Sequence, residues 1–218
     1  MKKLLSYIIP LDIKRYHTDK NGVLEVSLID GKKRLNSLHA NYSYGTLQSV
    51  LKLGLQQINL SGVRNVLLLG LGGGSAVQTL RDDFGFQGPV VGVDIDEVVV
   101  DIARNEFDMK NDPELSIVLD DACYYVRNTN EVFDLIIVDV FLDDKVPAAI
   151  YGWSFWKNID ARLHPGGYFL FNASIGPFRK NVFRGIGGCL AEKYRLRACQ
   201  YVLGTNHLLI GEKIKTSM

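Results

Sequence analysis

The chain has 218 residues, a length that allows one sizeable hydrophobic core and a small additional region. Hydrophobic residues make up 47% of it and charged residues 22%, the composition of an ordinary globular protein, which excludes a disordered or fibrous chain. The net charge of +1 hides a segregation, because residues 1–60 carry +5, residues 61–150 carry −11 and residues 151–218 carry +7. An acidic middle third favours a cationic ligand and disfavours nucleic acid.

The amino-terminal residues imitate a signal peptide, because two lysines precede a short apolar run. The run is too short to span a membrane and lacks a small-residue cleavage site. We therefore expect a cytoplasmic protein without a membrane partner, in which residues 4–9 form a strand. Three cysteines without metal-ligand spacing predict reduced thiols and no metal site.

Residues 1–43 are predicted to form a small antiparallel β region. Asn21-Gly22 and Asp30-Gly31 are tight-turn signals, and the residues between them partly alternate between apolar and polar. A β-hairpin sheet of this size is too small to fold alone, so we expect it to be an appendage of a larger domain, residues 44–218. A helix over residues 44–57 is predicted to open that domain.

A glycine-rich turn between two apolar strands is the most informative feature of the chain. Strand residues 66–69 run into the turn GLGGGS (residues 70–75), a helix pattern follows, and the next strand, residues 90–94, ends in Asp94. Glycines let such a turn bend tightly and let a ligand approach the backbone, while the helix directs its amino terminus at that ligand. An acid about two dozen residues after the first glycine is where such folds hold ribose hydroxyls. The residues predicted to bind a nucleoside cofactor are Gly70, Gly72, Gly74 and Asp94.

The rest of the chain alternates between predicted strands and helices. Strands are expected over residues 115–119, 133–139, 167–172, 195–202 and 207–211. Helices are expected over residues 75–84, 97–107, 121–127, 150–162 and 178–192. Uninterrupted apolar strands are typical of a parallel sheet covered on both faces, and the last two strands are joined by a turn short enough only for an antiparallel hairpin. The predicted fold is α/β, a Rossmann-like, doubly wound, mostly parallel seven-stranded sheet that ends in that hairpin.

The closing hairpin separates two classes of nucleoside-binding protein. A nicotinamide dehydrogenase continues with parallel strands and usually adds a substrate domain, for which 218 residues leave no room. A transferase of the class I methyltransferase fold, which uses S-adenosylmethionine, ends in such a hairpin. We therefore expect a sulfonium nucleoside as the cofactor.

These motifs together resemble the spermidine synthase family, the polyamine aminopropyltransferases built on the methyltransferase fold. The resemblance covers about residues 20–175. Besides the glycine turn, it rests on VDID (93–96), DDA (120–122), FDLIIVD (133–139), PA (147–148), LHPGG (163–167) and YSY (42–44). The resemblance implies S-adenosylmethionine or decarboxylated S-adenosylmethionine as the cofactor, a small-molecule amine as the acceptor, and a homodimer.

On the nucleoside side, the resemblance implies that Asp94 accepts both ribose hydroxyls and that Asp121 accepts the adenine amino group. Asp120 is the adjacent alternative to Asp121, and either side chain is also suited to capping the helix that follows. Asp96 is suited to capping the helix after the second strand, which leaves Asp94 for the ligand.

On the reaction side, the resemblance implies that Asp139 is the catalytic carboxylate. An amine nucleophile must be neutral to attack a carbon beside a sulfonium, so the site needs a base to accept or relay its proton. Tyr44 is implied to orient the amine, and Asp143 or Asp144 to hold its far end. Ordinary packing for Tyr44, and solvent exposure for the two acids, are the alternatives.

The sequence departs from the family pattern where the family recognises amines. Gly73 stands where aminopropyltransferases usually carry an aspartate, Gly45 where a glutamine follows the family's tyrosine, and Leu142 where the catalytic motif has its second acid. Three functions therefore stay open: aminopropyl transfer to an unusual acceptor, methyl transfer from S-adenosylmethionine itself, and nucleoside binding without catalysis.

Overall fold

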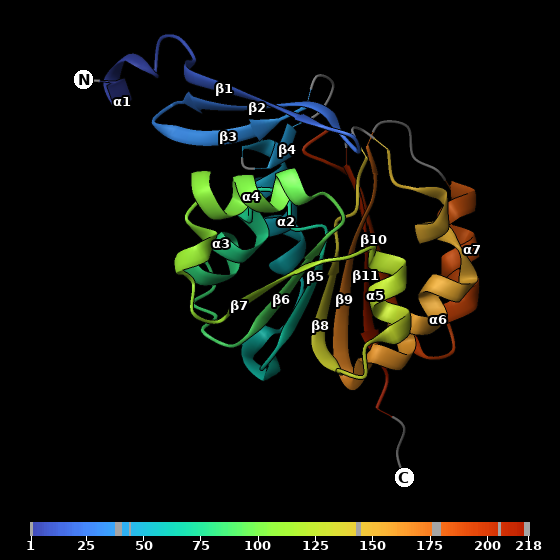
Figure 1. The fold of residues 1–218 in the computed structure, drawn as a ribbon. Helices are drawn as coiled ribbons and strands as arrows, with labels where there is room; N and C mark the ends of the chain where they lie inside the picture. Colours follow the sequence, from blue (N-terminus) through green and yellow to red (C-terminus); the bar gives the residue numbers. More distant parts are fainter. Residues whose placement is uncertain are drawn as a thin grey trace.

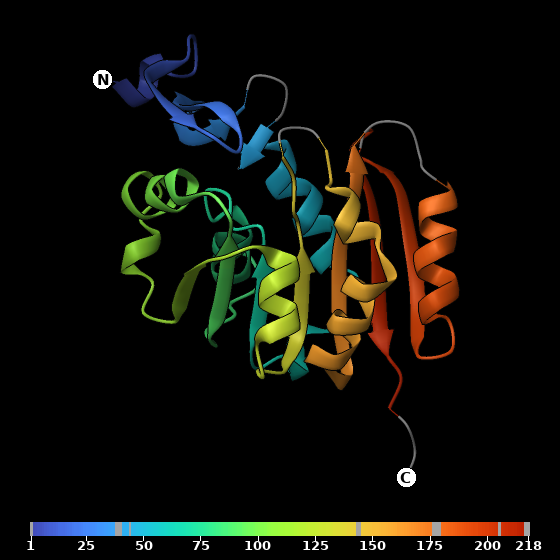
Figure 2. The same ribbon diagram turned by 45° about the vertical axis from the view of Figure 1, so that its right-hand side comes forward.

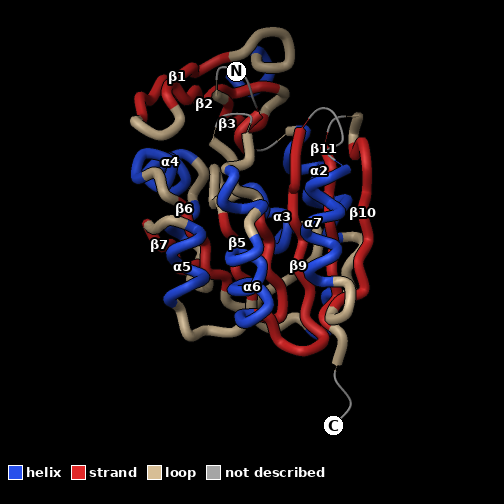
Figure 3. The backbone as a smooth tube through the Cα atoms, turned by 90° about the vertical axis from the view of Figure 1, so that its right-hand side faces the viewer, coloured by secondary structure: helices blue, strands red, loops and turns tan. Residues whose placement is uncertain are grey.

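The computed structural model describes residues 2–37, 41–43, 45–142, 145–175, 180–204 and 206–215, and contains two β-sheets (Figure 1). A four-stranded antiparallel sheet contains β1 (Leu11–Thr18), β2 (Gly22–Ile29), β3 (Lys32–Asn36) and β4 (Asn41–Ser43). A seven-stranded sheet contains β5 (Val66–Leu69), β6 (Val90–Asp94), β7 (Leu115–Leu119), β8 (Phe133–Val138), β9 (Leu163–Ile175), β10 (Tyr194–Val202) and β11 (Asn206–Lys213). Figures 2 and 3 show the smaller sheet above one end of the larger one.

The strand order of the larger sheet is β10-β11-β9-β8-β5-β6-β7. Neighbours from β9 to β7 pair in parallel, whereas β11 is antiparallel to both β9 and β10. The order reverses between β5 and β8, where a doubly wound sheet opens a crevice at the carboxyl ends of its strands. This arrangement confirms the predicted α/β fold with a mostly parallel seven-stranded sheet and a closing antiparallel hairpin.

Helices cover both faces of the seven-stranded sheet. One face packs against α2 (Thr46–Leu55), α3 (Ser75–Asp82) and α4 (Glu97–Glu106), and the other against α5 (Ala122–Asn128), α6 (Trp153–Arg162) and α7 (Lys180–Leu190). Successive residues of a buried strand serve the two faces in turn: Leu68 and Ile137 belong to the first core cluster, and Leu67 and Ile136 to the second. The unbroken apolar runs of β5 and β8 follow from this double burial. Short helical segments complete the fold: α1 (Lys2–Leu5), η1 (Leu60–Gly62), η2 (Met109–Asn111) and η3 (Ala148–Tyr151).

The strand predicted over residues 4–9 is wrong. Lys2–Leu5 form helix α1, residues 6–8 turn, and the first strand begins at Leu11. The apolar run indicated a strand because a sheet normally buries such residues, but here Leu4 and Ile8 remain 76% and 79% exposed. The strand before the Asn21-Gly22 turn is instead the largely polar segment LDIKRYHT, in which apolar and polar residues alternate only over the first four positions. The predicted small antiparallel β region is confirmed, and it has four strands.

Polar contacts attach the four-stranded sheet to helix α4. Glu106, the last residue of α4, accepts hydrogen bonds from Lys14 Nζ (2.6 Å), Lys33 Nζ (3.1 Å) and the Tyr16 hydroxyl (3.0 Å). Asn21, in the β1–β2 turn, donates from Nδ2 to Asp96 Oδ2 at 2.7 Å. The small sheet is therefore held at both ends of α4. The division into residues 1–43 and 44–218 stays a prediction.

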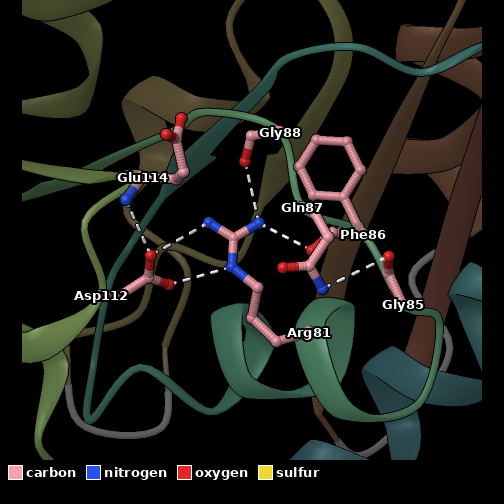
Figure 4. Close-up of polar contacts among 7 residues, drawn as sticks. All are labelled: Arg81, Gly85, Phe86, Gln87, Gly88, Asp112 and Glu114. Carbon is pink, nitrogen blue, oxygen red and sulfur yellow. Dashed lines mark hydrogen bonds and ion pairs between the residues drawn. The ribbon is translucent and has the colours of Figure 1, made fainter.

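Arg81, in the last turn of α3, ties together the segments that lead into β6 and β7 (Figure 4). Its Nε and Nη2 donate to the two carboxylate oxygens of Asp112 (2.9 and 3.4 Å), and its Nη1 donates to the carbonyls of Phe86 (2.9 Å) and Gly88 (2.8 Å). The Arg81 side chain is 15% exposed and that of Asp112 16%. The planar guanidinium suits this bidentate contact, and one side chain thus donates hydrogen bonds to acceptors in two loops.

Candidate active site

The carboxyl ends of β5, β6 and β8 meet at the edge of the sheet where the order reverses, and they bring three predicted site elements together. The backbone N–H of Gly70 donates to Val93 O at 2.8 Å, which joins the glycine turn to β6. The N–H of Asp139 donates to Leu69 O at 2.8 Å, which joins the end of β8 to β5. The glycine turn, Asp94 and Asp139 therefore form one site, although almost seventy residues separate Gly70 from Asp139.

The glycine turn needs two of its glycines for reasons internal to the protein. Gly70 has φ +88°, and a Cβ at this position would overlap the backbone carbonyl of Asp139. Gly74, with φ +85°, precedes α3, and a Cβ there would overlap the side chain of Met109. The clash at Gly70 is with backbone and excludes other residues with or without a ligand, whereas at Gly74 the left-handed φ is the main constraint, because the Met109 side chain can move. The cofactor contacts of Gly70, Gly72 and Gly74 stay predictions.

Asp94 is buried behind the glycine turn. Its Oδ2 accepts hydrogen bonds from the backbone N–H groups of Leu71 (3.0 Å) and Gly72 (3.1 Å), and its Oδ1 accepts one from Asp96 N (3.1 Å). Burial raises the pKa of Asp94 to about 6, against the opposing effect of these three hydrogen bonds. Asp94 thus fixes the shape of the turn, and Oδ1, which accepts one hydrogen bond from the described residues, retains capacity to accept a ligand hydroxyl.

Asp96 performs the capping role that the sequence offered to it. Its Oδ1 accepts the N–H of Val98 at 3.0 Å and caps helix α4, while its Oδ2 accepts from Asn21. Both oxygens of Asp96 are thereby used within the protein. Asp94 is not the cap.

Asp121 caps helix α5. Its Oδ1 accepts the N–H of Tyr124 at 2.9 Å, and its own N–H donates to Asp120 Oδ1 at 2.8 Å. Asp120 is joined to the site through its N–H, which donates to Asp94 O at 2.9 Å. The capping alternative is therefore realised by Asp121, whose side chain is exposed beside the carboxyl end of β6. Contact of Asp121 with an adenine amino group stays a prediction.

Asp139, immediately after β8, is half-buried and bonded on one side. Its Oδ1 accepts a hydrogen bond from Asn172 Nδ2 at 2.9 Å, and its Oδ2 accepts none from the described residues. Burial raises the pKa of Asp139 to about 6, and the hydrogen bond from Asn172 acts in the opposite direction. A carboxylate of this pKa is mainly ionised at neutral pH and can accept a proton there.

Sequence reasoning missed Asn172 and its neighbour Asn206. Asn172 lies in β9 and is 0% exposed, and Asn206 opens β11 and is 4% exposed. Asn206 Nδ2 donates to Asn172 Oδ1 at 3.1 Å, so the two amides and Asp139 form a chain. The available signal was an asparagine inside the otherwise apolar run YFLFNAS, because a buried amide requires partners.

Two predicted residues, Tyr44 and Asp143, lie outside the described residues. Of the positions that depart from the family pattern, Gly45 has φ +65° and precedes α2, and Leu142 is 40% exposed and forms an isolated bridge with Lys145. Within the described ranges there is no group of three or more His, Cys, Asp or Glu side chains suited to a metal ion. Those ranges also contain no helix that is both long and apolar enough to cross a membrane.

A cleft of about 430 Å³ lies at the opposite edge of the sheet, where β5 and β8 begin. Polar side chains dominate its lining, among them Asn59, Arg64, Asp134, Tyr168, Glu212 and Lys215. None of the predicted nucleoside-binding or catalytic residues lines it. The cleft is therefore separate from the site at the carboxyl ends of the strands.

Fold and site together define a protein of the class I methyltransferase fold with an acidic site at the strand ends. A family model described as the spermine/spermidine synthase domain matches residues 45–186, well over half of the chain. The chain therefore belongs to the spermine/spermidine synthase family. The match includes the glycine turn, Asp94, Asp121, Asp139 and Asn172.

Curated relatives include both aminopropyltransferases and a methyltransferase. The chain is 26% identical to polyamine aminopropyltransferase 2 of Aquifex aeolicus over 183 residues, 79% of this chain and 34% of the relative. It is 33% identical to the polyamine aminopropyltransferase of Thermoplasma volcanium over 120 residues, 53% of this chain and 42% of the relative. It is 31% identical to the eEF1A lysine and N-terminal methyltransferase of Danio rerio over 143 residues, 58% of this chain and 21% of the relative. The chain thus spans well under half the length of these relatives.

Solved structures share the fold at low sequence identity. A probable spermidine synthase from Corynebacterium glutamicum aligns with a TM-score of 0.67 at 19% identity, covering 93% of this chain and 80% of that one. Human methyltransferase-like protein 13 in complex with SAH aligns with a TM-score of 0.62 at 19% identity, covering 80% and 86%. A spermidine synthase in complex with the transition-state analogue AdoDATO gives 0.58 at 17% identity, covering 94% and 69%. These likenesses establish the fold, on which both reaction types occur.

Proposed function

We propose that the protein transfers an aminopropyl group from decarboxylated S-adenosylmethionine to the nitrogen of a small amine. The observation that carries the proposal is Asp139, an acid at the end of the central strand β8, beside the glycine turn. One carboxylate oxygen is held by Asn172 and the other accepts no hydrogen bond from the described residues. A half-buried base with one oxygen available is what removal of a proton from an amine requires.

The residues of the site suit the two halves of the reaction. Asp94 has acceptor capacity left on Oδ1 for a ribose hydroxyl, and Asp121 lies exposed beside the carboxyl end of β6, where an adenine amino group would find an acceptor. When bound, the cofactor would supply an electrophilic carbon beside a sulfonium. Asp139 attracts the cationic amine and accepts its proton, which leaves the nitrogen lone pair free to attack; the C–N bond forms as the C–S bond breaks, and methylthioadenosine leaves as the neutral thioether. Tyr44 and Asp143 are proposed to orient the amine.

Gly73 supports methyl transfer from S-adenosylmethionine as a second candidate. The turn carries no carboxylate at the position where aminopropyltransferases usually bind the amine of the donated propyl group. A methyl group needs no such partner. Both reactions displace at a carbon beside the sulfonium, so the role of Asp139 is the same in each.

Calorimetric titration with S-adenosylmethionine, its decarboxylated form and methylthioadenosine distinguishes the candidates. Tighter binding of the decarboxylated form, together with aminopropylated product detected by mass spectrometry in a panel of amines, supports the proposal. Preference for S-adenosylmethionine with methylated product supports the second candidate. Binding of none of the three would overturn both.

The base role is tested separately with Asp139→Asn. This variant should lower the transfer rate by about 100-fold or more, the usual contribution of a general base, and leave nucleoside affinity within about twofold. Asp134→Asn, the same change at a buried carboxylate on the opposite edge, is the matched control and should leave the rate unchanged. Equal rates in Asp139→Asn and the wild type would contradict the base role.

We also infer that the protein acts in the cytoplasm as a homodimer that binds no nucleic acid. The exposed apolar side chains of Leu4 and Ile8 and the edge strand β1 support a protein contact at the small sheet. Light scattering of the wild type and of Ile8→Lys tests the dimer, because a charge at the interface should favour the monomer. A wild-type monomer at micromolar concentration would refute it.

A further inference from the structure

The amides behind Asp139 lie on one face of the sheet, next to a β-bulge. In the pairing of β9 with β11, His207 lies opposite Ser174 and Leu208 lies opposite Asn172, so Ala173 is an extra residue. Successive side chains of a strand point to opposite faces, and a shift of one residue reverses the face. The extra residue lies in β9 after Asn172, so it does not change the face of Asn206, which is two residues from Leu208, the partner of Asn172. Leu170, Leu208 and Ile137, each two residues from one of the three side chains, belong to one core cluster, so Asn172, Asn206 and Asp139 share that face, and the two amides are bonded there.

We propose that Asn172, itself held by Asn206, is a positioning residue that fixes one carboxylate oxygen of Asp139 and leaves the other to receive the proton of the acceptor amine. The inference rests on the proposed function only in stating which proton Asp139 receives; the hydrogen bonds do not depend on that function. Asn172 Nδ2 lies 2.9 Å from Asp139 Oδ1, and Asn206 Nδ2 lies 3.1 Å from Asn172 Oδ1. Asn206 therefore sets the amide orientation, so that Asn172 presents its N–H₂ to the acid.

Burial restricts the Asn172 amide to one orientation. Asn172 is fully buried, and a buried amide that loses a partner is left with an unsatisfied group. Rotation of the amide by half a turn would place its oxygen against the Asp139 carboxylate and its N–H₂ against the N–H₂ of Asn206. Both contacts would be repulsive, so one orientation is selected.

Among the described residues, Asn172 is the polar side chain that affects the pKa of Asp139. Its raised pKa has two causes, burial and the opposing hydrogen bond from Asn172, and no charged side chain of the described residues contributes. His207, the titratable side chain next to Asn206, accepts a hydrogen bond from the N–H of Tyr201 at Nδ1 and is not among those causes. Removal of the Asn172 donor should therefore raise the pKa of Asp139 further.

Carbon-13 NMR titration of the aspartate carboxyl groups tests the arrangement without any activity. The Asp139 signal is assigned by its absence from Asp139→Asn. In Asn172→Leu its midpoint should rise by about one pH unit, which is what one hydrogen bond to a charged group is worth. Asn206→Leu should give a smaller rise, because the donor remains but loses its orienting partner. An unchanged or lowered midpoint in Asn172→Leu would overturn the proposal.

Two further variants guard against a trivial outcome. Asn65→Leu removes an asparagine that likewise makes two hydrogen bonds, to Val132 O and Asp134 N, at the opposite edge of the sheet, and should leave the midpoint in place. Asn172→Asp keeps the shape and the acceptor for Asn206 but replaces the donor with an acid, so it should raise the midpoint even if Asn172→Leu does not fold.

The kinetic arm separates failure of this proposal from failure of the proposed function. In Asn172→Leu the acidic limb of kcat/KM against pH should move upward with the NMR midpoint, kcat should fall, and nucleoside affinity should stay unchanged. A shifted NMR midpoint in a protein that transfers no group would leave the positioning role standing and remove the function. Transfer with both the limb and the midpoint unchanged would leave the function standing and remove the positioning role.

Discussion

Replacement of Asp94 by asparagine should change how the free energy of unfolding depends on pH. Folding raises the pKa of Asp94 from 3.8 to about 6, so the folded protein holds this proton more tightly than the unfolded chain does. The resulting stabilisation is fully present below the unfolded pKa and is lost as the pH rises through about 6. A shift of about two pH units corresponds to about 3 kcal/mol. Asp94 is 8% exposed, so solvent screening takes little from this figure.

Urea unfolding of the wild type and of Asp94→Asn over a pH series measures the effect. The free energy of unfolding of the wild type minus that of the variant should fall by about 2.5 kcal/mol between about pH 4 and about pH 7.5. Taking the difference cancels the other titrating groups. A difference that stays constant with pH would refute the reasoning, because Asp94 would then titrate alike in both states.

Ligand affinity gives the same prediction a second readout. A ribose hydroxyl donates to the ionised carboxylate, so nucleoside binding to the wild type should strengthen as the pH rises from about 5 to about 7. Asp94→Asn should bind more weakly and without that pH dependence. Asp134→Asn, a buried carboxylate at the far edge, should bind as the wild type does.

Three further predictions concern contacts described above. Arg81→Met should lower the free energy of unfolding by about 3 kcal/mol in urea, because Asp112 and two carbonyls lose their donor, and a loss below about 1 kcal/mol would contradict the assigned role. Glu106 is partly buried, which raises its pKa, but hydrogen bonds from Lys14, Lys33 and Tyr16 outweigh burial and lower the pKa to about 2. The stabilisation that Glu106 contributes is therefore present above the unfolded pKa of about 4.5 and is lost as the pH falls through about 2. At neutral pH, Glu106→Gln should increase the rate of amide hydrogen exchange in β1–β3 but not in β5 and β8. Gly70→Ala should lower the free energy of unfolding by at least about 2 kcal/mol and abolish nucleoside binding. In the control Gly85→Ala, where φ is +65° and the space around the position is open, the free energy of unfolding should fall by about 1 kcal/mol and binding should stay intact. Equal losses in the two variants would refute the steric argument.

The sheet was predictable because its signals are local. The apolar runs of β5 and β8 owe their composition to burial on both faces, and the short turn before β11 allows only an antiparallel hairpin. The glycine turn was predictable for the same reason, since φ values of +88° and +85° at Gly70 and Gly74 strongly favour glycine there. The strand prediction for residues 4–9 was wrong because an apolar run alone does not reveal whether those residues pair in a sheet.

The supporting side chains of the site depend on pairing between distant strands. Asn172 reaches Asp139 across neighbouring strands, 33 residues apart in the chain, and Asn206 reaches Asn172 because β11 pairs with β9 in the register that sets Leu208 opposite Asn172. No spacing in the sequence encodes that register. The sequence predicts Asp94 as a site residue, but its hydrogen bonds from the backbone of Leu71 and Gly72 follow from the folded turn and could not be predicted.

A continuous chain of hydrogen bonds runs from Asn21 through Asp96 to Asp94 and links the amino-terminal hairpin to the glycine turn. Asn21 bonds to Asp96, the N–H of Asp96 bonds to Asp94, and Asp94 holds the turn. Linkage is reciprocal: if a nucleoside at the turn stabilises the hairpin, the ordered hairpin increases nucleoside affinity by the same factor. By the same linkage, a contact that stabilises the small sheet at its outer face would increase nucleoside affinity at the turn.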